Sequence, residues 1–273
     1  ILIPPSIPMI LFALTANASI AALFVAGILP GILMCGGFMF MCWFVGKRRN
    51  FPRDTTPIEW SAFRTHLMYA SPALLLPVLI VLFLRFGIAT PTEVAVLSTL
   101  YAAAVSVAVY RDLSFKRLND AVVSAGLATG VVLLVIMASS AIGWLLTYDQ
   151  MPTGVAGWVT ENVHQDWLII LIMNLLMLFL GMFIDLPAAV LLLTPVFLPL
   201  AQSIGMDTTQ LGIMMVVNLA IGLYTPPVGT TLFITSALAK VKVGQTVREL
   251  GPFYLVAFLV LALVSYVPAS ILR

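Results

Sequence analysis

The sequence predicts an all-α, polytopic membrane protein in which two helices are interrupted by proline pairs. Hydrophobic residues make up 62% of the 273 residues, and charged residues make up only 9%. A soluble globular domain carries about 25% charged residues, so the composition excludes that class of protein. The other two observations are a series of long apolar runs and the pairs Pro4-Pro5 and Pro226-Pro227.

Eight apolar runs account for the predicted helices, and most of them are long enough to cross about 30 Å of hydrocarbon as an α-helix. They lie at residues 20–46, 67–84, 94–110, 121–147, 167–184, 186–201, 211–239 and 250–272. The first motif begins directly at Ile1, so we expect the chain to be the C-terminal portion of a longer protein.

Basic residues predict the orientation of these spans, because they are enriched in cytoplasmic loops. A cluster follows the first long run at residues 47–53, KRRNFPR. If this loop is cytoplasmic, threading the remaining spans leaves only Arg85 and Arg273, of the 13 Lys and Arg residues, on the opposite side. The connection 148–166, which has acids but no Lys or Arg, and the C-terminus are then predicted to be external.

Two polar segments need a separate interpretation. Residues 111–120, RDLSFKRLND, are predicted either as an interfacial helix at the cytoplasmic surface or as an ordinary loop. Glu93 follows Pro91 at the start of an apolar run, and capping of that helix, favoured by the helix dipole, explains its position.

The proline pairs belong to a weak internal repeat with an offset of 222 residues, which aligns Ile3 with Thr225. The predicted topology gives the two copies opposite orientations, which is typical of the inverted repeats of transporters. The matching pairs are Pro4 and Pro226, Pro5 and Pro227, Val25 and Val247, and Pro30 and Pro252.

The second proline pair is expected to expose main-chain oxygens. Proline lacks an N–H group and excludes the carbonyl four residues earlier from helical bonding. Pro226 would therefore free the carbonyl of Gly222, and Pro227 would free that of Leu223. With the next two carbonyls, at the negative end of the helix dipole, they would form a cluster of oxygens suited to a hard cation such as Na⁺.

The residues after the second break and those of the first break are expected to contribute as well. The N–H groups of residues 229–231 begin a second half-helix, whose positive end can hold a carboxylate. In the first copy, Pro8 would free the carbonyl of Pro4, and Ser6 would add a hydroxyl. A single kink is often explained by packing, but two kinks at matching positions of an inverted repeat favour a binding site.

Asp185 is the only acid deep within an apolar stretch, between the runs 167–184 and 186–201. No polar loop surrounds it, so we predict a re-entrant helical hairpin with its tip near the membrane midplane. Two roles are open: Asp185 N-caps the second arm, with Pro187 in the first turn, or it serves a sodium site or gate as an acid within the membrane. The two roles are compatible.

Five segments carry a resemblance to a known family, and together they cover essentially the whole chain. They are ILIPPSIPMI (1–10), GKRRNFPR (46–53), TPTEVAV (90–96), GMFIDLPAA (181–189) and MVVNLAIGLYTPPVGTTLF (215–233). The chain resembles the large membrane subunit of tripartite ATP-independent periplasmic (TRAP) transporters, which belong to the ion transporter superfamily.

The resemblance implies a permease subunit and not an enzyme. The permease would lie in the bacterial inner membrane, with a periplasmic C-terminus, and would import an organic acid, such as a C4-dicarboxylate or sialic acid, by Na⁺ symport. The implied partners are a small membrane subunit, a periplasmic solute-binding protein, the substrate and the lipid bilayer. The resemblance implies no nucleic acid and no cofactor other than the coupling ion. It also implies an elevator mechanism, in which the hairpins and broken helices move against a scaffold.

Site residues carried over from the family fall into two sodium sites and a substrate site. One sodium site would use Gly181, Asp185, Gly222, Thr225 and Gly229; the second would use Pro4, Pro5 and Ser6 with ligands from outside this chain; the substrate would lie near Ser6, Thr230 and Thr231.

The expected organisation has three parts, and alternative functions are open. Residues 1–46 complete the first inverted repeat, residues 47–165 form connecting and scaffold helices with an interfacial arm, and residues 166–273 form the second repeat. The alternative transporter is a Na⁺-coupled dicarboxylate or citrate carrier of the same superfamily without a binding protein. A membrane enzyme is disfavoured because Asp185 has no second acid close by in sequence. A channel is disfavoured because the chain lacks a ring of charges.

Overall fold

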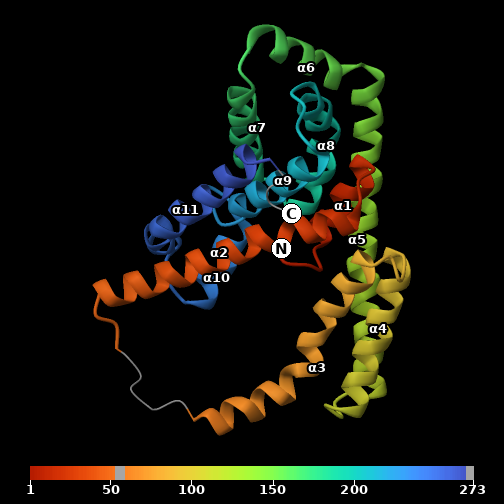
Figure 1. Cartoon of the computed structure of the whole chain (residues 1–273), viewed down its shortest axis with the longest axis vertical. Coiled ribbons are helices and arrows are strands. Elements are labelled where there is room, and N and C mark those ends of the chain that lie inside the picture. Colours follow the sequence, from red (N-terminus) through yellow and green to blue (C-terminus); the bar gives the residue numbers. More distant parts are fainter. Residues whose placement is uncertain (53–58, 269–273) are drawn as a thin grey trace. The chain divides into compact units, whose positions relative to one another are not determined.

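The computed structural model describes residues 1–52 and 59–268, and all regular structure in this part of the chain is helical. The predicted all-α fold is confirmed, and the apolar run 211–239 is divided into two helices. The helices in Figure 1 are α1 (Ile7–Ala16), α2 (Ile20–Arg48), α3 (Trp60–Arg85), α4 (Pro91–Ala108), α5 (Phe115–Tyr148), α6 (Met151–Asn162), α7 (Asp166–Gly181), α8 (Leu186–Ser203), α9 (Thr208–Gly222), α10 (Thr230–Leu238) and α11 (Val243–Tyr266).

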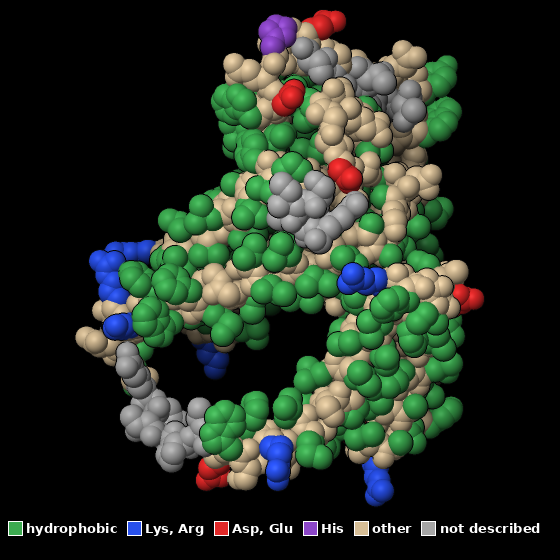
Figure 2. Space-filling view, viewed as in Figure 1, with side chains coloured by type: hydrophobic (Ala, Val, Ile, Leu, Met, Phe, Trp, Pro, Cys, Tyr) green, Lys and Arg blue, Asp and Glu red, His purple; other side chains and the backbone are tan. Residues whose placement is uncertain are grey.

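Six of the described helices, α2, α3, α4, α5, α8 and α11, are long and apolar enough to cross a membrane. The helices α1, α7 and α9 are also apolar but shorter. Hydrophobic side chains are exposed along the helices (Figure 2), whereas a soluble protein rarely exposes large contiguous apolar surface. The chain is therefore a multi-pass membrane protein, as the composition predicts. Two predictions from the basic residues fall outside the described part of the chain: the external position of Arg273 and the cytoplasmic position of Arg53.

Contacts divide the chain into two compact units, one made of residues 1–41 and 132–273, and the other of residues 42–131. In the smaller unit α3 packs against α4. The hydroxyl of Tyr101 donates to the carbonyl of Pro72 at 2.9 Å, which links the two helices. The helix α4 begins with a capping box, in which the Glu93 carboxylate accepts from the main-chain N–H of Thr90 at 2.7 Å. The predicted capping role of Glu93 is thus confirmed.

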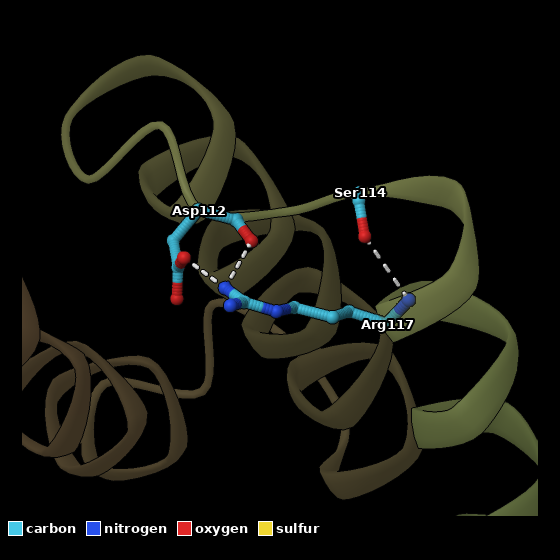
Figure 3. A network of polar contacts seen from close by, with 3 residues as sticks. All are labelled: Asp112, Ser114 and Arg117. Atoms are coloured by element: carbon cyan, nitrogen blue, oxygen red, sulfur yellow. Dashed lines mark hydrogen bonds and ion pairs between the residues drawn. The ribbon is translucent and has the colours of Figure 1, made fainter.

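The structure differs from the sequence predictions at two places between residues 111 and 166. Residues 111–114 are not helical, and α5 begins at Phe115 and continues as one long helix, so the segment 111–120 is neither a separate interfacial helix nor a simple loop. Arg117 pairs with Asp112, and its main-chain N–H donates to the side-chain oxygen of Ser114 at 3.3 Å (Figure 3). In addition, the connection after α5 contains the helix α6, which was not predicted.

Helix α9 forms the centre of the larger unit. All of its residues from Thr209 to Gly222 are buried except Ala220, and it packs against α1, α7, α8 and α11. Gly212 permits close approach of the N-terminal helices, because a Cβ atom there would lie 2.6 Å from Phe12 and 2.7 Å from Leu23. The core of this unit therefore includes both the beginning and the end of the sequence.

A buried polar network joins α7, α9 and α11. The side-chain amide of Asn218 donates to the side-chain oxygen of Asn174 at 2.8 Å and to its main-chain oxygen at 2.9 Å. Asn174 in turn donates to the Ser265 hydroxyl at 3.0 Å, and Gln210 donates to main-chain oxygens at the end of α11. The Oδ1 atom of Asn218 has no partner among the described residues. Because an apolar solvent offers these amides no alternative partner, the network fixes the three helices in one register.

The helix bounds keep the offset of 222 residues that the proline pairs suggest. Shifted by this offset, α1 would span residues 229–238, and α10 spans Thr230–Leu238. Shifted in the same way, α2 would begin at residue 242, and α11 begins at Val243. Each of these two long helices contains the matched proline, Pro30 or Pro252. Their inverted orientation in the membrane stays a prediction.

Replacing Asn174 by Ala should lower the melting temperature of the detergent-solubilised protein, because the Asn218 amide loses its side-chain acceptor and Ser265 loses a donor. We expect a loss of roughly 1 kcal/mol, the scale of a neutral hydrogen bond between membrane helices. The matched control is Asn162→Ala, which removes an exposed amide whose bond is local, to the carbonyl of Trp158 in the same helix. Equal melting temperatures for the two variants would contradict a structural role for the network.

Candidate ion and substrate site

The second proline pair interrupts an apolar stretch, as predicted. Helix α9 ends at Gly222, residues 223–229 are not helical, and α10 begins at Thr230. We call residues 223–229 the second break. The first proline pair likewise lies in a non-helical segment, residues 1–6, which we call the first break and which precedes α1. The peptide bonds Pro4-Pro5 and Pro226-Pro227 are both cis.

Two of the carbonyls that the prolines were expected to free are bonded to other groups. The Gly222 oxygen accepts from the N–H of Thr225 at 3.0 Å. The Leu223 oxygen accepts from the N–H of Thr231 at 3.0 Å, across the break. The expectation of free oxygens at these two positions was therefore wrong, because the chain folds back and supplies new donors. A carbonyl oxygen has two lone pairs, so the Gly222 oxygen retains one that could bind a cation. The Leu223 oxygen also accepts from the N–H of Leu232 at 3.4 Å, so both of its lone pairs are used.

The main-chain oxygen of Thr225 is the better candidate ligand. It accepts no hydrogen bond from the residues that the structure describes, and it faces Gly229, where a Cβ atom would lie only 2.8 Å away. The Thr225 hydroxyl donates to the carbonyl of Ile221 at 2.7 Å and also lies next to the Tyr254 hydroxyl. Two oxygens of one residue thus lie at the break, and both can coordinate a hard cation.

Two of the three main-chain amides at residues 229–231, which the sequence predicts to be available for an anion, already donate to carbonyls. The N–H of Gly229 donates to the carbonyl of Met182 at 3.1 Å, and the N–H of Thr231 donates to Leu223. Of the three amides considered for anion binding, only that of Thr230 has no acceptor among the described residues. The side chains of Thr230 and Thr231 are exposed at the start of α10. An anion here would meet one amide, two hydroxyls and the positive end of the helix.

The helices α7 and α8 form the predicted helical hairpin, and its tip, residues 182–185, contacts the second break. Gly181 and Gly222 meet main chain to main chain: a Cβ atom on Gly222 would lie 2.6 Å from the carbonyl carbon of Gly181. The Met182 bond to Gly229 lies at the same junction. The structure therefore brings together three predicted site residues, Gly181, Gly222 and Gly229, as packing partners whose small size lets the tip and the break touch.

Asp185 lies at the N-cap position of α8, but its carboxylate makes no capping hydrogen bond. Its main-chain oxygen accepts from Ala189 at 2.9 Å, as the first bond of the helix. The side chain is exposed and has no bonding partner among the described residues. By contrast, Asp207 at the N-cap of α9 accepts from the N–H of Thr209 at 2.6 Å. Capping by the side chain therefore does not explain Asp185.

The first break is packed differently from the second. Ser6 is buried and N-caps α1, where its hydroxyl oxygen accepts from the N–H of Met9 at 3.5 Å. Pro4 is buried and Pro5 is exposed. Two glycines of α2 pack closely against the first break. A Cβ atom on Gly27 would lie 2.8 Å from the Leu2 oxygen, and one on Gly31 would lie 2.7 Å from the Ile3 side chain. No hydrogen bond among the described residues joins this segment to the second break.

Sequence reasoning missed two residues that contact the second break. Met182 supplies the carbonyl that accepts from Gly229. Tyr254 of α11 donates its hydroxyl to the carbonyl of Tyr224 at 2.6 Å. A main-chain carbonyl leaves no signal in the sequence, but a tyrosine hydroxyl within an apolar helix needs a partner, and that requirement could have drawn attention to Tyr254.

Replacing Gly222 by Ala should destabilise the protein by roughly 1–3 kcal/mol, because the methyl group would overlap the main chain of Gly181, which cannot give way like a side chain. The measurement is the melting temperature of the purified protein. The matched control is Gly36→Ala in α2, where a Cβ atom would meet nothing within 4 Å and alanine favours the helix. A melting temperature of Gly222→Ala at or above that of Gly36→Ala would show that the tip and the break do not touch.

Comparisons with known proteins identify the family. The family model described as the tripartite ATP-independent periplasmic transporter, DctM component, matches residues 1–270. The chain is 36% identical to the C4-dicarboxylate TRAP transporter large permease protein DctM of Pseudomonas aeruginosa, over 98% of this chain and 63% of the relative. It is 35% identical to the 2,3-diketo-L-gulonate TRAP transporter large permease protein YiaN of Escherichia coli, over 99% and 64%. It is also 35% identical to the sialic acid TRAP transporter large permease protein SiaM of Vibrio cholerae, over 98% and 62%.

The chain spans less than two thirds of the length of each of these relatives. The match with the family model nevertheless covers nearly all of the chain, and the resemblance seen in its proline and glycine motifs is confirmed. The chain belongs to the DctM family, the large permease components of tripartite ATP-independent periplasmic transporters.

Proposed function

We propose that this chain is part of a permease that imports an organic acid across the bacterial inner membrane by symport with Na⁺. The observation that carries the proposal is the second break, which contains the oxygens of Thr225 and is bonded to the hairpin tip through Gly229 and Met182. The tip ends at Asp185, whose carboxylate has no partner among the described residues. Broken helices with unwound carbonyls are where secondary transporters bind their coupling ions. An acid within a membrane segment is a functional candidate for the same reason.

In the proposed ion site, Thr225 and Asp185 supply oxygen ligands and the three glycines determine the shape. Gly181 and Gly222 allow the hairpin to approach the break, and Gly229 takes a left-handed conformation, with φ of 43°, next to the Thr225 oxygen. Their role is thus to remove side-chain bulk around the ligands. A second sodium site, with Pro4, Pro5 and Ser6, would need ligands from outside this chain, since only a capping hydroxyl and main-chain carbonyls are present there.

The substrate is proposed to bind through its carboxylate at the start of α10. The Thr230 amide and the hydroxyls of Thr230 and Thr231 are available there, and Ser6 would contribute from the first break. The positive end of a helix attracts an anion without a fixed positive charge. Relatives named for C4-dicarboxylates, sialic acid and 2,3-diketo-L-gulonate support an organic acid as the substrate class.

The proposed assembly includes a small membrane subunit and a periplasmic solute-binding protein, and its C-terminus is periplasmic. Membership in a family of tripartite periplasmic transporters supports these partners. Elevator movement of the hairpin and broken helices against a scaffold is part of the same proposal. The alternative is a Na⁺-coupled carrier of the same superfamily that needs no binding protein.

Asp185→Asn should abolish or strongly weaken stabilisation of the purified permease by Na⁺. A ligand that binds only the folded state raises its stability by about 2.7 kcal/mol at 100 times the dissociation constant, so the melting temperature should rise with NaCl in the wild type and stay flat in the variant. Choline chloride at equal concentrations controls for ionic strength.

The matched control for this test is Asp207→Asn, which changes the acid that does cap a helix. Asparagine also caps well, so this variant should retain the full Na⁺ response. If Asp185→Asn and Asp207→Asn gave the same Na⁺ titration as the wild type, Asp185 would not be a sodium ligand.

Uptake by membrane vesicles that contain the complete permease should depend on the periplasmic binding protein. The assay uses radiolabelled succinate, sialic acid and 2,3-diketo-L-gulonate, each with and without the binding protein that loads it, under an inward Na⁺ gradient. We expect accumulation of one of these acids only when its binding protein is present. Equal uptake without any binding protein would favour the alternative carrier.

A further inference from the structure

The four carbonyls at residues 222–225 differ in their partners. Those of Gly222 and Leu223 accept from main-chain N–H groups within the break and α10, whereas the Thr225 oxygen accepts from none of the described groups. The Tyr224 oxygen accepts from a side chain of another helix, the hydroxyl of Tyr254 in α11, at 2.6 Å. This hydrogen bond joins α11 to the second break.

The aromatic rings of Tyr224 and Tyr254 support the same contact. They are stacked, with centroids 5.6 Å apart and an interplanar angle of 23°. Tyr254 also stacks on Phe258, one turn further along α11, at 6.2 Å. The ring of Tyr254 is therefore fixed on both sides, and its hydroxyl has a defined direction.

We propose that Tyr254 is a positioning residue of the second break, whose hydroxyl sets the affinity of the ion site by fixing the peptide group between Tyr224 and Thr225. The inference rests on the proposed Na⁺ site at Thr225. One end of this peptide is held by Tyr254, and its other end, the N–H of Thr225, donates to Gly222 at 3.0 Å. With both ends bonded, the backbone of Thr225 has little freedom, and its own oxygen stays directed at Gly229.

The physical effect is preorganisation. A ligand group that is already held in its bound direction loses little conformational freedom on binding, so affinity is higher. The hydroxyl also occupies the Tyr224 oxygen, which directs a cation toward the neighbouring Thr225 oxygen instead. Tyr254 thus contributes to ion binding without being a ligand.

Among the described residues, no tyrosine hydroxyl bonds to the first break. With the offset of 222 residues, the position of Tyr254 corresponds to Ile32 and that of Tyr224 to Leu2. The side chain of isoleucine cannot donate a hydrogen bond, and the Leu2 oxygen is packed against Gly27 instead. The two breaks are consequently different in chemistry, although their prolines match.

The test is Tyr254→Phe in the purified full-length permease, measured by Na⁺-dependent thermal stabilisation and by amide hydrogen exchange of Thr225 and residues 228–231. Phenylalanine keeps the ring stacking and removes only the hydroxyl. We expect the Na⁺ midpoint to rise about tenfold, the scale of one lost hydrogen bond, and exchange in the break to become faster. Tyr266→Phe is the matched control, since Tyr266 is in the same helix and donates to the carbonyl of Trp167 at 3.1 Å, away from the break.

The outcomes separate the inference from the proposed function. A raised midpoint for Tyr254→Phe with an unchanged midpoint for Tyr266→Phe supports the inference. If the wild type responds to Na⁺ and Tyr254→Phe has the same or a lower midpoint, Tyr254 does not position the site. If the wild type shows no response to Na⁺ beyond that to choline, the proposed function fails and the inference fails with it.

Discussion

The hydrogen bond from Gly229 to Met182 is the interaction on which the arrangement of the second break depends. Seven residues without helical bonding lie there within an apolar stretch, and in hydrocarbon each unsatisfied main-chain group costs several kcal/mol. The break is tolerated because its N–H groups find carbonyls in the hairpin tip and in the preceding helix end. The close contact of Gly181 with Gly222 makes this possible, since any side chain at Gly222 would force the two main chains apart. Hairpin and break therefore form one structural element.

The positions of the breaks and of the hairpin could be predicted from the sequence, because they follow from local rules. Pro226 and Pro227 cannot continue a helix, and an apolar stretch divided by Asp185 without a polar loop favours a tight helical hairpin. The partners of the exposed main-chain groups could not be predicted in the same way. Met182 lies far from Gly229 in sequence, and Tyr254 lies far from Tyr224, so these bonds arise only from tertiary packing. The helix α6 was missed because its sequence is less apolar than that of the other helices.

The two acids at helix starts, Asp185 and Asp207, show a further limit of sequence reasoning. Both occupy N-cap positions, and asparagine or aspartate at such a position is ordinarily explained by capping. Only Asp207 makes the capping bond. The difference is one of side-chain direction, which no local pattern records. The same holds for Ser6, which the sequence marks as a possible ligand and which the structure uses as a buried cap.

The glycines of α2 let the first break lie directly against this helix. The main chain at Leu2 and the side chain of Ile3 occupy the space that side chains at positions 27 and 31 would fill. The non-helical segment at residues 1–6 packs closely on α2 because these two positions are glycines. A side chain at position 27 or 31 would therefore push the residues that lead into Pro4-Pro5 away from α2.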